Sequence, residues 1–315
     1  MKRSILLAAM AGLLTSAATP KIKLVEPSYH LIPGSIPQDK GPDGNSIFLD
    51  APKGLILVDT GRHPEHAAKL LAYARERGKP IAAIVNTHWH LDHTTGNVDI
   101  RQAYPKAQVY ATLAVDGALA TFLADSRKRA EAKPTTDPNT LRFLERMKDP
   151  NSIRPTVPVT KSGPLKIAGR KLDVYVAPFA STEADLWLYV PNEGLVIAGD
   201  LVVGIVPFMD TACADGWKKA LVEIAATPFS TLIPGHGYPM TRAQFLQWKG
   251  AFDRFVDCGR STRMKEECVA GWKRDAAPFI DAEHSDYVTE AAGYYLDTRL
   301  RSSSEEQEKY CKPLK

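Results

Sequence analysis

The sequence lacks three features that would assign it to other classes of protein. Beyond its first 14 residues, no apolar run approaches the roughly 20 residues that a membrane-spanning helix needs, so we expect no membrane insertion. It has no Cys-x-x-Cys pair, which argues against a zinc ribbon or thioredoxin-like redox chemistry. The formal net charge is only +4. Without Lys2 and Arg3 it falls to about +2, too weak an excess to indicate a nucleic-acid partner.

The N-terminus has the pattern of a secretory signal peptide. Lys2 and Arg3 give a basic start, residues 5–14 are a short apolar stretch, and small residues follow as far as Ala18. This order predicts a signal peptide at residues 1–18, cleaved near Ala18, and an exported protein that is periplasmic or secreted. The alternative is an N-terminal helix that stays with the fold.

Export changes how the four cysteines are interpreted. An even number in an oxidising compartment predicts disulfides among Cys213, Cys258, Cys268 and Cys311. Three pairings are open. Cys258 with Cys268 would close a short loop, but the sequence does not choose among them.

The remaining chain alternates short apolar runs with helical patterns, as an α/β protein does. Apolar runs predict strands at 21–25, 46–49, 55–58, 81–85, 165–176 (a hairpin), 186–190, 195–198 and 231–233. A helical apolar stripe runs through Ala67, Leu70, Leu71 and Ala74, and residues 217–226 predict another helix. Polar helices at 113–150 are expected to cover the site or to pack on its rim.

The C-terminal part of the sequence indicates helices. Thr241 and Gln244 fit a capping box, and an aromatic stripe beginning at Phe245 is expected to be core. We therefore expect one domain at 21–240 and a helical extension at 241–315 packed on it. The last dozen residues are charged, and we expect them to be frayed.

A metal-binding segment lies where the strand at 81–85 ends. His88 and His90 are two residues apart, so in an extended segment they point the same way and can hold one ion. Asp92 and His93 follow on the turn and are expected to face a second ion. Imidazole and carboxylate ligands without thiolate suit zinc, and also iron or manganese. The alternative is a histidine cluster with no ligand role.

Two later strand ends offer further ligands. Asp200 follows an aliphatic run and Gly199, and its carboxylate could bridge two metals. His236 lies between Gly235 and Gly237, which leaves room for close approach of the backbone.

Taken in order, these motifs resemble the metallo-beta-lactamase superfamily from about residue 45 to 240, and the turn that begins at Asp59 also fits. The resemblance implies an αβ/βα four-layer sandwich with metals at one edge of the two sheets. It also implies that His88 and His90 serve a first metal, that Asp92, His93 and His236 serve a second, and that Asp200 bridges them.

One ligand that the resemblance implies is missing. Serine stands at Ser181, where members carry a histidine, and no histidine occurs between His93 and His236. The first metal site is therefore expected to be weak. The replacement ligand could be the Ser181 hydroxyl, the Glu183 carboxylate or a water. His63 and His66 are further candidates, although a place at a helix N-terminus would also explain them.

The resulting functional hypothesis is a zinc-dependent hydrolase with one or two ions. A metal-bound hydroxide, oriented by Asp92, would attack the carbonyl of a small β-lactam, lactone, ester or thioester. The alternatives are a mononuclear iron oxidoreductase similar to sulfur dioxygenases and a degenerate metal-binding protein without activity. No sequence feature selects the substrate or predicts the oligomeric state.

Overall fold

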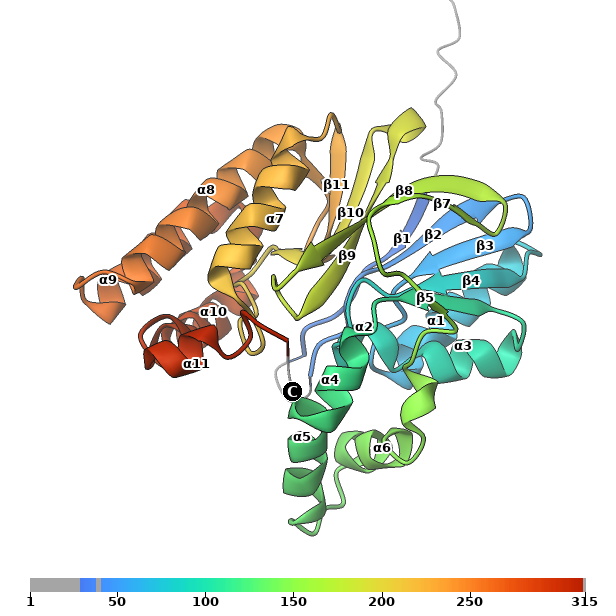
Figure 1. The fold of residues 1–315 in the computed structure, drawn as a ribbon, viewed down its shortest axis with the longest axis horizontal. Coiled ribbons are helices and arrows are strands. Elements are labelled where there is room, and N and C mark those ends of the chain that lie inside the picture. Colours follow the sequence, from blue (N-terminus) through green and yellow to red (C-terminus); the bar gives the residue numbers. More distant parts are fainter. Residues whose placement is uncertain (1–28, 38–40, 314–315) are drawn as a thin grey trace, which may run out of the picture.

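The computed structural model describes residues 29–37 and 41–313. Two six-stranded sheets pack face to face, and helices cover the outer face of each, which gives four layers (Figure 1). The α/β sandwich expected from the sequence is confirmed. The predicted signal peptide and the strand expected at 21–25 lie outside the described residues.

The first sheet carries the N-terminal half of the fold. It contains β1 (Tyr29–Ile32), β2 (Ser46–Ala51), β3 (Gly54–Val58), β4 (Ile81–Val85), β5 (Gln108–Ala111) and β6 (Val157–Pro158), in that spatial order. The first three strands are antiparallel neighbours, and β3 to β6 pair in parallel. The carboxyl ends of β3 and β4 therefore meet at one edge, where the histidine segment begins.

The second sheet follows along the chain. Its spatial order is β12 (Met240–Thr241), β11 (Thr231–His236), β10 (Leu195–Val203), β9 (Ala184–Val190), β8 (Arg170–Pro178) and β7 (Gly163–Ile167). β7 and β8 form the expected hairpin, with Ala168 and Gly169 at its turn in left-handed conformation (φ 46° and 88°). β10 and β11 pair in parallel, so Asp200 and His236 reach the same edge.

Alternating side chains join these layers, as the two-residue period of a strand dictates. On β2, Ile47 and Leu49 point between the sheets and meet Leu186 and Leu188 of β9. Phe48 points the other way, into the core formed with the outer helices of the first sheet. The central strands of both sheets are buried on both faces in this way, whereas β1, β7 and β8 keep exposed or half-buried residues.

The helices fall into three groups. They are α1 (Pro64–Glu76), α2 (Leu91–Thr94) and α3 (Asn97–Ala103) beside the first sheet; α4 (Ala114–Ala120), α5 (Phe122–Glu131) and α6 (Pro138–Arg146) in the segment at 113–150; and α7 (Ala214–Ala226), α8 (Arg242–Gly259), α9 (Lys265–Asp275), α10 (Ser285–Tyr295), the π-helical turn Leu296–Leu300 and α11 (Ser304–Glu308) beside the second sheet. α4 to α6 form the lobe at the bottom of Figure 1.

The C-terminal helices share their core with the second sheet. Thr241 and Gln244 form the predicted capping box of α8, with Gln244 N–H donating to Thr241 Oγ1 at 3.3 Å. Phe245 and Trp248 are buried, and the Trp248 indole donates to the Val203 carbonyl at 2.8 Å. The aromatic stripe is therefore core, as expected.

Two disulfides join the four cysteines, Cys213 with Cys311 and Cys258 with Cys268. The expectation that the last dozen residues are frayed is wrong for the described part of that segment, up to residue 313. Tyr310 is buried there, and the disulfide to Cys213 anchors Cys311 next to the start of α7. A covalent link across 98 residues of chain cannot be inferred from local charge.

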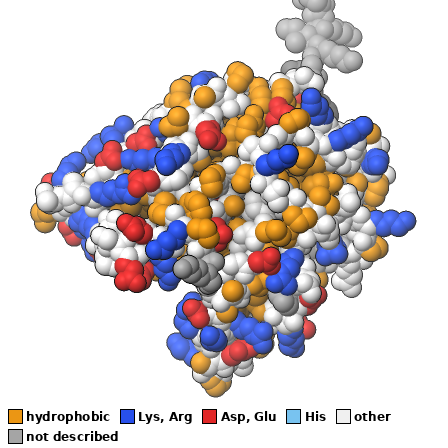
Figure 2. Space-filling view, in the orientation of Figure 1, with side chains coloured by type: hydrophobic (Ala, Val, Ile, Leu, Met, Phe, Trp, Pro, Cys, Tyr) orange, Lys and Arg blue, Asp and Glu red, His pale blue; other side chains and the backbone are white. Residues whose placement is uncertain are grey.

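The surface is mixed in charge on the face shown in Figure 2, where basic and acidic side chains alternate over the outer helices. Within the described ranges, every helix is too short or too polar to cross a bilayer.

Candidate metal centre

Asp59 organises the start of the site at the carboxyl end of β3. Its Oδ1 accepts the Thr87 backbone N–H at 2.8 Å, and its Oδ2 accepts the Thr87 hydroxyl at 2.7 Å and lies 2.7 Å from His93 Nδ1. Because the Thr87 hydroxyl donates to Asp59, it can only accept from His88 Nδ1, 3.0 Å away. Both imidazoles are thus protonated at Nδ1 and present Nε2 to the site.

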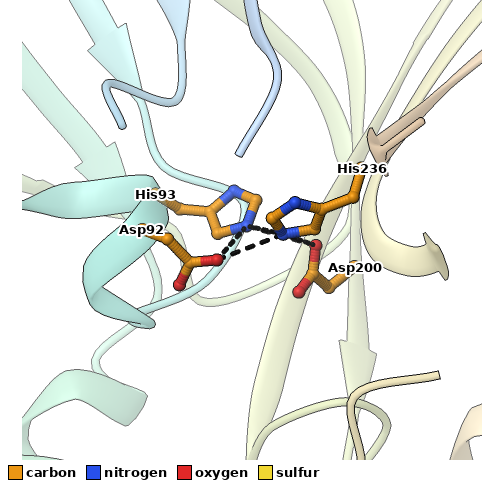
Figure 3. Close-up of side chains that lie close together, drawn as sticks. All are labelled: Asp92, His93, Asp200 and His236. Carbon is orange, nitrogen blue, oxygen red and sulfur yellow. Dashed lines mark hydrogen bonds and ion pairs between the residues drawn. The ribbon is translucent and has the colours of Figure 1, made fainter. Parts of the chain in front are cut away.

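Four residues form the first of two groups of converging ligands, which we call the complete cluster: Asp92, His93, Asp200 and His236 (Figure 3). Their ligand atoms lie within 4.8 Å of one another, and all four side chains are buried. His93 Nε2 is 3.1 Å from Asp200 Oδ1, and His236 Nε2 is 3.1 Å from Asp92 Oδ2. This is the tetrahedral number of nitrogen and oxygen ligands that a zinc-type ion takes.

His88, His90 and Asp200 form the second group, the three-ligand cluster. His88 Nε2 lies 3.7 Å from Asp200 Oδ2. His90 Nε2 lies 2.9 Å from the hydroxyl of Thr211, which itself donates to the Ser181 carbonyl at 3.0 Å. The hydroxyl therefore accepts from His90 Nε2–H, which leaves His90 Nδ1 with its lone pair available for an ion.

The backbone comes close to these ligands at Gly235. A Cβ at that position would lie 2.0 Å from Asp200 Oδ1, so a side chain there would displace the carboxylate that both clusters share. The glycine before His236 is therefore needed for close approach, as the sequence suggested.

The buried carboxylates and imidazoles of the complete cluster shift one another's pKa values. Burial raises the pKa of Asp92 and Asp200, but the neighbouring histidines, above all His93, outweigh it and hold both pKa values below the ordinary range. Burial works against a charged His93, yet the carboxylates of Asp200, Asp59 and Asp92 raise its pKa well above the usual value. Two buried carboxylates thus demand a positive charge between them.

Buried polar atoms in the two clusters indicate that a metal ion, and not only a proton on His93, can supply this positive charge. His88 Nε2 and Asp200 Oδ2 are buried and have no hydrogen-bond partner among the described residues, and Asp200 Oδ1 meets the ring nitrogens of His93 and His236 at 3.1 and 3.4 Å. Such atoms are costly unless a ligand satisfies them. The donor set of imidazoles and carboxylates fits a divalent metal ion at both clusters.

The sequence profile of the metallo-beta-lactamase superfamily matches residues 40–236, which is more than half of the chain. This chain belongs to the metallo-beta-lactamase superfamily. The segment includes all six residues of the two clusters.

Individual relatives from the superfamily are distant. The chain is 26% identical over 229 residues to a linear primary-alkylsulfatase from Pseudomonas sp., which covers 62% of this chain and 41% of that protein. It is 26% identical over 212 residues to a hydroxyacylglutathione hydrolase from Chromohalobacter salexigens, covering 64% and 66% of the two chains. The chain thus spans less than two thirds of the length of either relative.

Solved structures agree on the fold. A metallo-beta-lactamase family protein from Thermus thermophilus superposes with a TM-score of 0.59 at 19% identity, covering 85% of this chain and 93% of that one. The sec-alkylsulfatase Pisa1 from Pseudomonas sp. superposes with a TM-score of 0.57 at 18% identity, covering 80% and 47%.

Ser181, where the sequence resemblance implied a histidine, directs its hydroxyl toward a carboxylate. It donates to Asp185 Oδ1 at 2.5 Å, and the Thr182 N–H donates to the other oxygen at 3.0 Å. Burial raises the pKa of Asp185 to about 6, while these hydrogen bonds oppose the rise. Glu183, the other candidate, belongs to neither cluster among the described residues.

His63 and His66 lie beside the site without joining either cluster. His63 Nδ1 is 2.9 Å from Asp43, and His66 Nε2 is 2.8 Å from the Ser46 hydroxyl. Sequence reasoning missed the roles of Thr87 and Thr211, since nothing in the local pattern marks either hydroxyl as a partner of a ligand. For Asp59, the one sequence signal was its place in a turn that fits the superfamily pattern.

A cavity of about 340 Å³ opens next to the clusters, and we call it the aromatic chamber. His90 and Asp92 form its inner wall. Its apolar wall is built from the aromatic side chains Trp89, Phe122, Phe143, Phe208, Tyr287 and Tyr295. Arg62 also lines it, and its guanidinium lies 3.6 Å from Asp92 Oδ1. The segment at 113–150 contributes Phe122 and Phe143, so it covers the site as the sequence predicted.

Proposed function

We propose that this chain is a metal-dependent hydrolase, with zinc as its metal, that cleaves the carbonyl bond of a small β-lactam, lactone, ester or thioester. The observation that carries the proposal is the pair of buried clusters sharing Asp200 and opening onto the aromatic chamber. The superfamily and the relatives named as hydrolases support it.

The clusters suggest which residues would hold the metal. The complete cluster would hold one ion, and the three-ligand cluster a second, more weakly bound ion. Bound there, a divalent metal supplies a water of lowered pKa and polarises a substrate oxygen.

Side chains of the protein would orient the water and the substrate. Of the two carboxylates in the complete cluster, Asp92 lines the chamber and Asp200 does not, so Asp92 is the one able to accept a hydrogen bond from the attacking water. Burial raises the pKa of Tyr287 to about 12, and Asp210 and Asp92 add to the rise. Its hydroxyl therefore stays protonated at neutral pH and can donate to a substrate oxygen.

A sulfate ester is the second candidate substrate. One relative is named a linear primary-alkylsulfatase, and the aromatic chamber offers an apolar surface for an alkyl chain. The hydrolase hypothesis has more support than the iron oxidoreductase or the inactive binding protein, because the named relatives are hydrolases.

Chelation tests the proposal. Protein stripped of metal and reloaded with zinc, iron(II) or manganese(II) would be assayed with a chromogenic cephalosporin, a lactone, p-nitrophenyl acetate, a thioester and p-nitrophenyl sulfate. We expect at least one carbonyl substrate to be hydrolysed, with activity lost on chelation and restored best by zinc. Turnover of the sulfate ester alone would favour the second candidate, and no turnover with any metal would refute both.

We also propose export. The two disulfides fit an oxidising compartment, and the pattern of residues 1–18 fits a cleavable signal. Intact mass measurement of protein from the native host would test this, since a chain that retains residues 1–18 would contradict it.

A further inference from the structure

A second cavity adjoins the aromatic chamber, and its chemistry is different. Arg62, Leu91, Ser126 and Phe143 line both cavities, so the two share a wall. The second cavity, of about 410 Å³, has apolar lining residues too, but its charged and polar ones include Arg62, His63, Asp137, Thr140, Arg142 and Arg146. We call it the cationic chamber.

Carboxylates also border this chamber, but the guanidinium groups keep donors that these carboxylates do not use. Asp99 accepts from Arg142 and from Arg146, each at 2.9 Å. Asp137 accepts from the Thr140 N–H and hydroxyl at 2.8 and 2.6 Å, which fixes the start of α6. Asp43 accepts the backbone N–H groups of Arg62 and His63 at 2.6 and 2.8 Å. A guanidinium has five N–H donors, so the contacts to Asp99 leave donors of Arg142 and Arg146 for a ligand.

Arg62 stands between the two chambers. Its Nε donates to the Pro42 carbonyl at 3.1 Å, and its terminal nitrogen lies 3.6 Å from Asp92 Oδ1. Asp92 belongs to the complete cluster, where a bound metal would engage the carboxylate. The guanidinium then remains available to a ligand that reaches from one chamber into the other.

One buried donor at this chamber lacks an acceptor. Nε of Arg142 is buried and has no hydrogen-bond partner within the described part of the chain. Because leaving a buried N–H unsatisfied is costly, this atom calls for an acceptor supplied by a ligand.

We propose that the cationic chamber binds an anionic group of the substrate, such as a carboxylate, phosphate or sulfate. The apolar part of that substrate would lie in the aromatic chamber. Arg62 at the shared wall and Arg146 on α6 would hold the anion. A guanidinium presents paired donors that match the oxygens of such groups. The assignment to the substrate rests on the proposed hydrolase function; the binding of an anion does not.

Binding of inorganic phosphate to metal-free protein tests the chamber itself. Calorimetric titration of the chelated protein avoids anion binding at the metals. We expect Arg146→Gln to weaken phosphate binding by roughly 10-fold or more, as loss of a charge-assisted hydrogen bond does. Arg77→Gln is the matched control. It also removes one guanidinium from an ion pair, with Asp50 at 3.0 Å, but lies at the far end of α1.

Ser126→Glu provides a second variant that breaks no ion pair of the chamber. It puts a negative charge on the shared wall, and we expect the same loss of phosphate binding even if Arg146→Gln folds poorly. Phosphate binding that is absent in the wild-type protein, or equal in all variants, would overturn the proposal.

A matched pair of esters tests whether the anion belongs to the substrate. Neutral p-nitrophenyl acetate would be compared with the monoanionic p-nitrophenyl hemiester of glutaric acid, using the metal-loaded enzyme. We expect Arg146→Gln to lower kcat/KM for the anionic ester about 10-fold relative to the neutral one, whereas Arg77→Gln leaves the ratio unchanged.

The two arms distinguish the possible failures. Phosphate binding that depends on Arg146 together with an unchanged ester ratio would show that the chamber takes a separate free anion, which overturns its assignment to the substrate. If neither ester is hydrolysed by the wild-type enzyme, ester hydrolysis fails, and the phosphate titration still decides whether the chamber binds anions.

Discussion

The two ligand clusters share one carboxylate and differ in what surrounds it. Around Asp200 Oδ1, His93 and His236 approach to 3.1 and 3.4 Å, and Asp92 completes a set of four. Around Asp200 Oδ2, His88 stands at 3.7 Å and His90 completes a set of three. Ser181, where the resemblance implied a further ligand, has its hydroxyl bound to Asp185.

Histidine ligands of both clusters have hydrogen-bond partners that orient their rings. Asp59 holds His93, the Thr87 hydroxyl holds His88, and the Thr211 hydroxyl holds His90. Such outer partners fix the ring orientation and tautomer of a ligand. The three-ligand cluster is therefore short of a ligand but is not disorganised, which favours a weaker metal site over a decayed one.

The largest expected effect separates the two clusters directly. His236→Gln removes a ligand of the complete cluster, and His90→Gln removes one from the three-ligand cluster. Loss of an outer partner of a metal ligand costs at most roughly 100-fold, and we expect His236→Gln, which removes a ligand itself, to lower kcat/KM by more than that. We expect His90→Gln to lower kcat/KM by about 10-fold. Elemental analysis of metal content and steady-state kinetics would measure both, and equal losses would contradict the ranking.

The local parts of this picture could be predicted from the sequence. The strand at 81–85 matches β4, and the capping box at Thr241 begins α8, because periodicity and capping depend on neighbouring residues. The six clustered ligands could be proposed because superfamily motifs carry them.

Long-range contacts could not be predicted in that way. Thr211 meets His90 across 121 residues of chain, and Cys213 meets Cys311 across 98. No spacing rule connects such pairs. The Ser181–Asp185 bond is local, but whether a buried serine turns to a carboxylate or to an ion depends on the tertiary surroundings. The sequence therefore left the replacement ligand open.

Restoring the missing imidazole should narrow the difference between the clusters. Ser181→His would add a nitrogen ligand to His88, His90 and Asp200. We expect the metal content to rise toward two ions per chain, with affinity at the three-ligand cluster improved by about 10- to 100-fold, as an added imidazole ligand completes a tetrahedral set. Metal titration with a chromogenic competitor would measure it.

Ser181→Ala is the matched control for that substitution. It also breaks the hydrogen bond to Asp185 but supplies no ligand, so its metal content should stay at the wild-type value. A rise in metal content in both variants would mean that release of Asp185, and not the new imidazole, strengthens the cluster.

The smallest effect concerns His66, a buried histidine that belongs to neither cluster among the described residues, and it tests whether its surroundings keep this imidazole neutral. Burial lowers the pKa of His66 to about 4, with like charge from Lys69 adding to the shift and Asp43 opposing it. Because the unfolded chain then binds more protons between about pH 6.5 and 4, stability is full above about pH 6.5 and falls as the pH drops toward 4. At about pH 5 this one group should cost the fold about 2 kcal/mol relative to pH 7.

His66→Gln, which cannot take up the proton, should therefore lose less stability than the wild-type protein between about pH 7 and 5 in urea unfolding. Parallel losses in the two proteins would show that His66 does not report on burial, and that the acid sensitivity of this edge of the fold comes from the clusters themselves.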